Sequence, residues 1–209
     1  MIAEPVTLAT DYALAAVCIW LGLLLYRKSE AQRSRAFWGA ACIVLGLSAL
    51  LGGTYHGFQR SIPNFAASWL WKCTLMLIGL ASFCMLAGSA NATSAGALRK
   101  GLLVLAIAML LAYEGWMLRH DQFIWAIADT GSTMAAVLIL HGFRHEEAGA
   151  RWILAGVGAS AAAAGAQAGG LVLHESFSHN DLYHVIQIAA MALFYRGAST
   201  IRDWRTPSG

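Results

Sequence analysis

The sequence predicts an all-α membrane protein, a bundle of seven transmembrane helices. Of its 209 residues, 58% are hydrophobic and 12% are charged, and the mean hydropathy is +0.59. A soluble domain carries about 25% charged residues, so this composition excludes an ordinary soluble domain. Seven apolar runs are each long enough to cross a bilayer core, which takes about 20 helical residues. The basic residues between these runs lie mainly on one side.

The seven runs follow one another with short connections and no soluble insertion, which predicts a single domain, 1–209. Their approximate limits are 7–26, 36–58, 66–89, 99–118, 122–143, 152–173 and 180–198. The sixth run consists almost entirely of small residues, with Gly165 and Gly169 in GxxxG spacing. Such a face lets helices pack closely in lipid. Alternatively, a slim helix leaves a slot for a lipid chain.

The distribution of the fourteen Lys and Arg residues predicts the orientation. Arg60 and Arg119 lie on one side, and Lys72 lies within the third run. The other eleven share the opposite side: Arg27, Lys28, Arg33, Arg35, Arg99, Lys100, Arg144, Arg151, Arg196, Arg202 and Arg205. Because cytoplasmic loops carry the excess of basic residues, we expect the N-terminus outside and the C-terminus in the cytoplasm. The expected location is the plasma (inner) membrane as a multi-pass protein, with the lipid bilayer and no nucleic acid as partner.

Six of the seven runs carry one ionisable residue in the half expected to face outward. These residues are Asp11, His56, Lys72, Glu114, Asp129 and His184. An ionisable group within a span is costly and usually functional, so the segregation predicts one polar cavity open to the outside. Lys72 is expected to pair with Asp129 or Glu114, because an ammonium in hydrocarbon needs a partner. The alternative is that each group is a structural polar residue, paired or wetted at the interface.

The beginning of the last run is its most polar part. Ser178 followed three residues later by Asp181 is typical of a helix N-terminus, with the serine as cap and the acid near the positive end of the helix dipole. On this helix His184 shares a face with Asn180 and Gln187. His179, Asn180 and Asp181 are therefore expected at the mouth of the cavity, with Asp11 from the first run.

The histidine pattern resembles the CREST superfamily of seven-span membrane proteins, which includes the alkaline ceramidases and the progestin and adipoQ receptors. His56, at the end of the second run, matches a zinc-binding histidine of that family, and His184, in Tyr183–His184–Val185, matches another. The resemblance implies zinc as cofactor. The chain departs from the family pattern, since Asn180 stands four residues before His184 where the family has histidine. Either His179, Asp181 or Glu114 supplies the third ligand, or the metal site has been lost.

Two functions remain open from the sequence. The first is a ceramidase-like, zinc-dependent membrane amidohydrolase acting on a lipid amide or ester. In that reading Glu114 or Asp129 transfers the proton of a metal-bound water, and Lys72 binds a headgroup or an oxyanion. The second is a non-catalytic receptor, transporter or accessory protein that binds a small amphiphile. More remote alternatives are a retinal pigment with its Schiff base on Lys72 and a haem protein ligated by His56 and His184.

Overall fold

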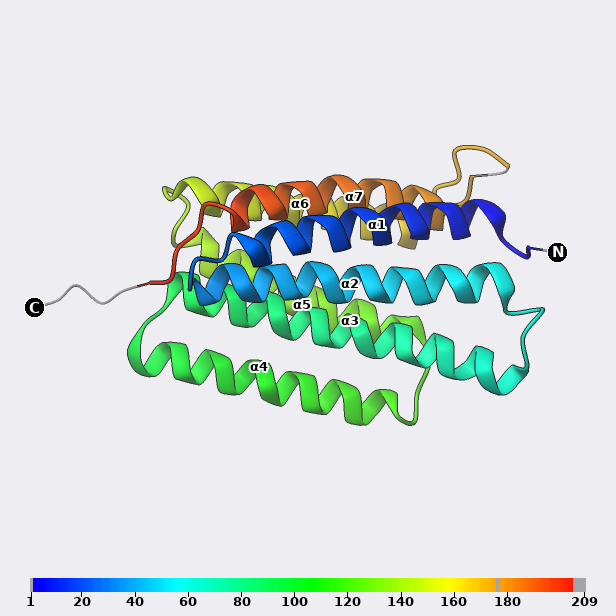
Figure 1. Ribbon diagram of the computed structural model, residues 1–209, viewed down its shortest axis with the longest axis horizontal. Coiled ribbons are helices and arrows are strands. Elements are labelled where there is room, and N and C mark those ends of the chain that lie inside the picture. The colour runs from blue at the N-terminus through cyan, green and yellow to red at the C-terminus, as the bar shows by residue number, and fades with distance from the viewer. Residues whose placement is uncertain (1, 176, 205–209) are drawn as a thin grey trace, which may run out of the picture.

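The computed structural model describes residues 2–175 and 177–204, which form seven helices (Figure 1). Within these residues the only β-structure is an isolated bridge between His174 and Phe177. The helices are α1 (Pro5–Arg27), α2 (Arg33–Phe58), α3 (Asn64–Thr93), α4 (Gly96–Met117), α5 (Phe123–Gly142), α6 (Ala148–Ala168) and α7 (His179–Ala198). The prediction of an all-helical protein is confirmed.

The five helices α1 to α5 are long and apolar enough to cross a membrane. α6 and α7 have 21 and 20 residues, but they fall outside this group of the described helices. Alanine and glycine dominate α6, and the first half of α7 is polar, so both have a lower hydropathy than the other five. The seven-span count and the orientation therefore stay predictions.

The sixth helix is shorter than its apolar run, because it ends at Ala168 and not near residue 173. Gly170 has φ of 61°, a left-handed conformation that glycine adopts without a steric penalty. Its N–H donates to the carbonyl of Gln167, and the N–H of Leu171 donates to the carbonyl of Ala166. This is the hydrogen-bond pattern of a Schellman motif, which stops the helix.

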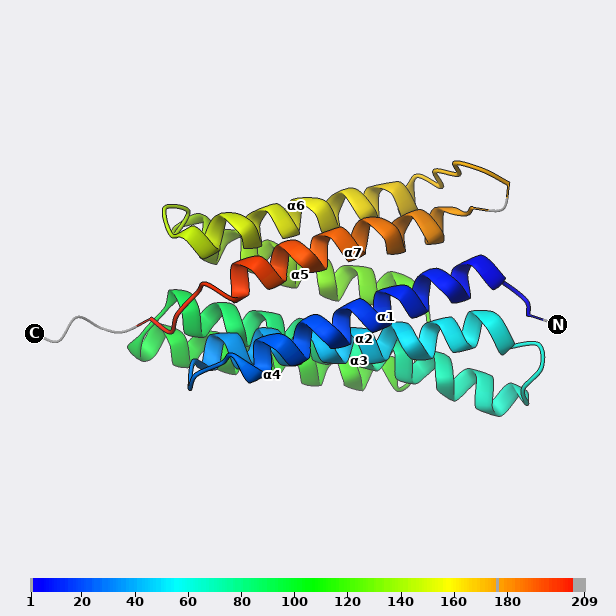
Figure 2. The same cartoon turned by 45° about the horizontal axis from the view of Figure 1, so that its top comes forward.

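Six of the seven helices form a ring. Going round it, the neighbouring pairs are α1–α2, α2–α3, α3–α5, α5–α6, α6–α7 and α7–α1. α4 packs against α3 outside this ring and lies at the edge of the bundle in Figure 1. Figure 2 shows α1 and α7, the first and last helices, running next to each other. The exposed face of α4, which includes Leu98, Val104 and Leu111, is apolar, as expected for a surface in contact with lipid.

Glycines bring α1 and α2 into close contact. Gly39, Gly46 and Gly53 recur every seven residues along α2, a spacing that keeps them on one face. A Cβ at Gly46 would lie 2.9 Å from the carbonyl oxygen of Ala15, and one at Gly53 would lie 2.7 Å from Cβ of Asp11. Because α2 has no side chains at these positions, α1 approaches its backbone, and Asp11 is held against α2.

The segment after α7 closes the opposite end of the bundle. The backbone N–H of Trp204 donates to the carbonyl of Asn91 at 2.8 Å, and Arg99 donates to the carbonyl of Trp204. The guanidinium of Arg144 lies 3.2 Å from the centre of the Trp204 ring, a cation–π contact. The last described residue, Trp204, thus contacts α3, α4 and the segment that follows α5.

Candidate functional site

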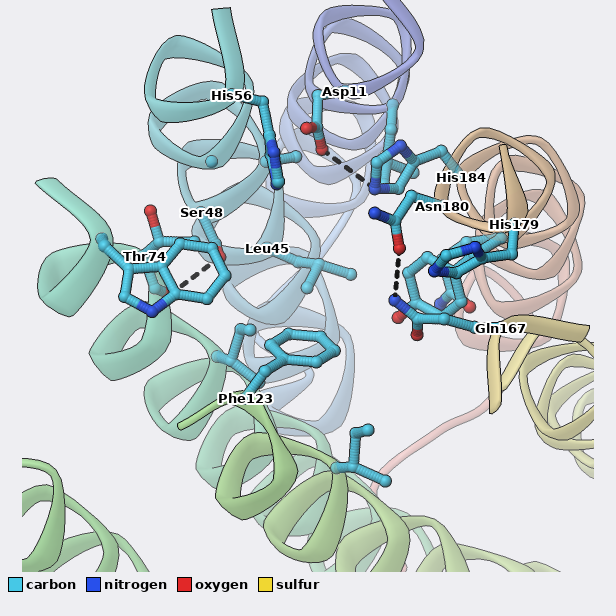
Figure 3. Close-up of a pocket in the computed structure, with 18 of the residues that line it drawn as sticks. Asp11, Leu45, Ser48, His56, Thr74, Phe123, Gln167, His179, Asn180 and His184 are labelled. Atoms are coloured by element: carbon cyan, nitrogen blue, oxygen red, sulfur yellow. Dashed lines mark hydrogen bonds and ion pairs between the residues drawn. The ribbon is translucent and has the colours of Figure 1, made fainter. Parts of the chain in front are cut away.

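A cavity of about 440 Å³ lies inside the helix ring, at the end where α7 begins. All six ring helices line it, and none of the lining residues comes from α4. Its polar lining residues are Asp11, Ser48, His56, Thr74, Gln167, His179, Asn180, Tyr183, His184 and Gln187. Figure 3 shows labelled members of this set pointing toward one another from different helices. We call this cavity the polar pocket.

The ring of His184 joins α7 to α1. Its Nε2 lies 3.2 Å from Oδ1 of Asp11, and its Nδ1 lies 3.0 Å from Oγ1 of Thr10. With the imidazole proton on Nε2, the histidine donates to the carboxylate of Asp11. The Thr10 hydroxyl, which bonds Nδ1, also lies 3.1 Å from the carbonyl oxygen of Thr7. Asp11 and His184 are both buried. The second carboxylate oxygen of Asp11, Oδ2, is buried and has no hydrogen-bond partner among the described residues.

His56 faces the same pocket from α2. Its Nδ1 lies 2.9 Å from Oε2 of Glu4, just before the start of α1. Gln59 donates to the other oxygen of Glu4 at 3.3 Å. Nε2 of His56 has no hydrogen bond with any residue that the structure describes, and Figure 3 shows the ring across the cavity from His184 and Asp11. His56 is therefore oriented by Glu4 and keeps one nitrogen for another partner.

The first turn of α7 forms one wall of the polar pocket. Ser178 and Asp181 form the expected capping box, since each side chain bonds the backbone N–H of the other. Asp181 is thereby engaged in the cap and is not among the lining residues. Asn180 accepts a hydrogen bond of 3.0 Å from Gln167 at the end of α6, and His179 lies beside them (Figure 3). The capping prediction is confirmed.

Aromatic side chains line the mouth of the polar pocket. Trp71, Phe123 and Tyr183 belong to its lining. The Trp71 ring packs against Tyr55, His56 and Phe123, with centroid separations of 5.0, 6.1 and 6.1 Å. Its Nε1 donates to the carbonyl of Asp121 at 2.8 Å, which fixes the indole in place. The pocket thus combines an acid and three imidazoles with an aromatic wall.

Next to the polar pocket lies a second cavity of about 430 Å³, which we call the apolar chamber. Leu45, Ile78, Phe123, Ile127, Gln167, Tyr183 and Gln187 line both spaces. Beyond them the chamber is lined by Met134 and Leu138 of α5 and by the small residues Ser160, Ala161 and Ala164 of α6. The small-residue run of α6 therefore faces an open space at these positions. The two neighbouring cavities thus differ in their lining: the polar pocket carries most of the ionisable and amide side chains, and the apolar chamber is lined mainly by apolar ones.

Three of the predicted site residues lie elsewhere. Glu114 belongs to α4, outside the ring, and Asp129 of α5 faces it beside Ser82 of α3. Lys72 Nζ donates to the carbonyl of Leu118, the C-cap of α4, at 2.9 Å. It forms no ion pair with a described residue, so the expected pairing with Asp129 or Glu114 is wrong. The carbonyl end of α4 attracts the ammonium because the helix dipole is negative there.

The single polar cavity inferred from depth is therefore divided. The structure brings together Asp11, His56, His179, Asn180 and His184, and it places Lys72, Glu114 and Asp129 around α3 and α4. Depth in a span is readable from the sequence, but the direction in which a side chain points depends on the neighbouring helix. Since α4 lies outside the ring, its acid cannot reach the polar pocket.

The histidines do not fit a three-ligand zinc site as they are arranged. Both ring nitrogens of His184 are engaged, by Asp11 and Thr10, and Nδ1 of His56 is engaged by Glu4. Among the described residues no three His, Cys, Asp or Glu side chains are grouped so as to hold a metal ion. A catalytic zinc needs three protein ligands and an open position.

Several residues of the site were missed by sequence reasoning. Thr10 and Glu4, which orient the two histidines, precede or begin the first span and have no distinctive pattern. Trp71 lines the pocket as well, and nothing in the sequence around it distinguishes it from the other tryptophans. One signal was available: the seven-residue spacing of Gly39, Gly46 and Gly53 predicts the close contact of α2 with another helix.

Comparison with known proteins gives one match, to the model of a family of unknown function, DUF6962, over residues 6–203. No curated protein and no solved structure matches the chain. The matched range contains all seven helices except the first residue of α1, and it includes every residue of the polar pocket. The chain belongs to the DUF6962 family.

Proposed function

We propose that this chain is a membrane protein that binds an amphiphile inside its helix ring. The observation that supports the proposal best is that the two cavities lie next to each other and share seven lining residues. One end carries Asp11, His56 and His184, and the other is lined by Met134, Leu138 and alanines. A ligand site of this kind has a few polar groups that fix orientation and apolar walls that supply affinity. An alkyl chain would occupy the apolar chamber, and the headgroup would lie in the polar pocket.

The proposed topology is seven spans in the inner membrane, with the N-terminus outside. It is supported by the eleven-to-two distribution of loop Lys and Arg residues. In this orientation the polar pocket opens to the outer side, so the headgroup would lie at the outer leaflet. Reporter fusions in the 28–32 connection and after residue 204 should both give cytoplasmic signals. A periplasmic signal from either fusion would contradict the orientation.

Photoaffinity labelling tests the binding proposal. A long-chain alcohol with a diazirine near the chain terminus would be irradiated with the purified protein in lipid nanodiscs, and modified peptides would be mapped by mass spectrometry. We expect saturable labelling of residues that line the apolar chamber, such as Met134 and Val157, which unlabelled alcohol competes away. Labelling confined to exposed residues such as Leu111, without saturation, would show lipid-like contact only and would overturn the proposal.

A ceramidase-like hydrolase is the second candidate. One observation favours it: His56 and His184, the two histidines that match the CREST pattern, line the same pocket. For zinc to bind both, His184 would have to release Asp11 or Thr10. Metal analysis of protein purified without chelators decides between the candidates. Stoichiometric zinc that disappears in His56→Ala would favour the hydrolase, whereas substoichiometric metal in both proteins would favour the binding protein.

A further inference from the structure

We propose that the headgroup bound in the polar pocket is a protonated amine, so that the ligand class is a long-chain alkylamine. The inference rests on the proposed function, because it names the chemistry of the ligand's polar end. Three features of the polar pocket carry it: a buried carboxylate oxygen without a partner among the described residues, a described lining without Lys or Arg, and the aromatic wall.

The first feature is Asp11. Asp11 is only 4% exposed, and its side chain lines the polar pocket. Oδ1 is engaged by His184 at 3.2 Å, whereas Oδ2 is buried and has no partner in the part of the chain that the structure describes. A buried carboxylate oxygen that accepts no hydrogen bond is unfavourable. A ligand that brings an N–H or O–H donor to Oδ2 would satisfy it.

The second feature is charge. No Lys or Arg occurs among the described residues that line the polar pocket or the apolar chamber. Lys72, the basic side chain nearest in sequence to the lining, binds the carbonyl of Leu118 instead. Glu4 and Asp181 add two further acids close to Asp11. The polar end thus presents acids without a Lys or Arg among the described lining residues, which selects a cationic headgroup over a carboxylate or a phosphate.

The third feature is the aromatic wall. Trp71, Phe123 and Tyr183 line the same pocket as Asp11, and the hydrogen bond from Trp71 to the carbonyl of Asp121 fixes the indole. The faces of aromatic rings attract an ammonium group through their negative quadrupole. A neutral alcohol would use the hydrogen bond to Asp11 but not this attraction. A quaternary ammonium would use the rings but has no N–H for Oδ2.

Competition against the photoreactive alcohol tests the inference in nanodiscs of phosphatidylcholine. The competitors are dodecylamine, dodecanol, dodecanoate and dodecyltrimethylammonium, each compared at equal bilayer concentration. We expect dodecylamine to compete at least about tenfold better than the other three, since a charge-assisted hydrogen bond in a desolvated site contributes that much or more. Asp11→Asn should remove most of this preference, whereas Glu175→Gln, which removes an exposed acid in the loop before α7, should retain it.

The outcomes separate the two proposals. If the alcohol probe labels the apolar chamber saturably but dodecanol or dodecanoate competes as well as dodecylamine, the amine assignment is wrong and amphiphile binding stands. If dodecyltrimethylammonium equals dodecylamine, the hydrogen bond to Asp11 is not the determinant and the assignment fails as well. If no saturable labelling of the chamber occurs with any probe, the proposed function itself fails. The preference in the wild type is decisive even if Asp11→Asn does not fold.

Discussion

The carboxylate of Asp203 caps helix α2, because its Oδ1 accepts a hydrogen bond of 2.8 Å from the backbone N–H of Ser34. Its Oδ2 accepts a second one, of 2.9 Å, from the N–H of Arg33. The N–H groups of the first helical turn lack partners within the helix, and Gln32, the N-cap of α2, forms no side-chain cap. The chain therefore satisfies the start of its second helix with a residue that follows its last one.

Asp203→Ala should lower the free energy of unfolding by about 1 kcal/mol, the usual loss when a helix N-cap is removed. The measurement is thermal denaturation in detergent, followed by circular dichroism. Glu146→Ala serves as the matched control, since Glu146 is exposed and lies in the loop before α6. A decrease no larger than that of the control would show that the contact contributes nothing to stability.

Asp11 and His184 should be energetically coupled. Alanine replacement of either residue leaves the other buried without its partner, so the double variant should be less destabilised than the two single variants together. The expected coupling is about 0.5–3 kcal/mol in a double-mutant cycle. Asp11 combined with His141, which contacts Ser89 at the other end of the ring, should behave additively. Additivity of Asp11 with His184 would contradict the α1–α7 link.

Lys72→Met should destabilise the protein by about 1 kcal/mol or less, since a solvated hydrogen bond to a carbonyl contributes roughly this amount. Combined with Asp129→Asn or Glu114→Gln, its effect should be additive, because the ammonium contacts Leu118 and neither acid. The readout is again thermal stability in detergent. A coupling clearly above 0.5 kcal/mol, the usual scatter of independent sites, would show that Lys72 does pair with an acid.

Gly22→Ala should destabilise the α1–α2 contact by about 1–3 kcal/mol, the range for overpacking a close interface. A Cβ on Gly22 would lie 2.7 Å from the carbonyl oxygen of Gly39 and 2.9 Å from the backbone nitrogen of Ile43. Backbone atoms cannot rotate away, so the helices must separate. Gly101→Ala is the control, since a Cβ there meets nothing within 4 Å. Equal stability of the two variants would show that α1 and α2 tolerate a wider spacing.

The helices were largely predictable because each apolar run is bounded by charged or turn-forming residues. The ends of α2 and α7 agree with the predicted limits at Phe58 and Ala198. The sixth helix was overextended, because Leu171, Val172 and Leu173 continue the apolar composition after the helix has stopped at Gly169 and Gly170. Composition reports burial or lipid contact, whereas the Schellman motif depends on a local backbone conformation.

The site was predictable only in part. His184, Asn180 and Gln187 share a face by helical periodicity, and all three line the polar pocket. The periodicity of one helix does not reveal which neighbour it meets, so Glu114 and Asp11 appeared equivalent although α4 lies outside the ring. The order of helices around a bundle is set by packing between faces, such as the glycine face of α2, and a single span does not encode it.

The closing of the ring by α1 and α7 has a consequence for biogenesis. In the proposed seven-span topology, a chain made from its N-terminus inserts α1 first and α7 last, so Asp11 enters the bilayer long before His184 exists to bond it. Until then the carboxylate is an isolated polar group in hydrocarbon, which is costly. The N-terminus of α2 likewise remains uncapped until Asp203 has been synthesised. The polar pocket is therefore completed only at the end of synthesis, and a prematurely terminated chain would remain an open, incompletely satisfied bundle suited to recognition by quality-control proteases.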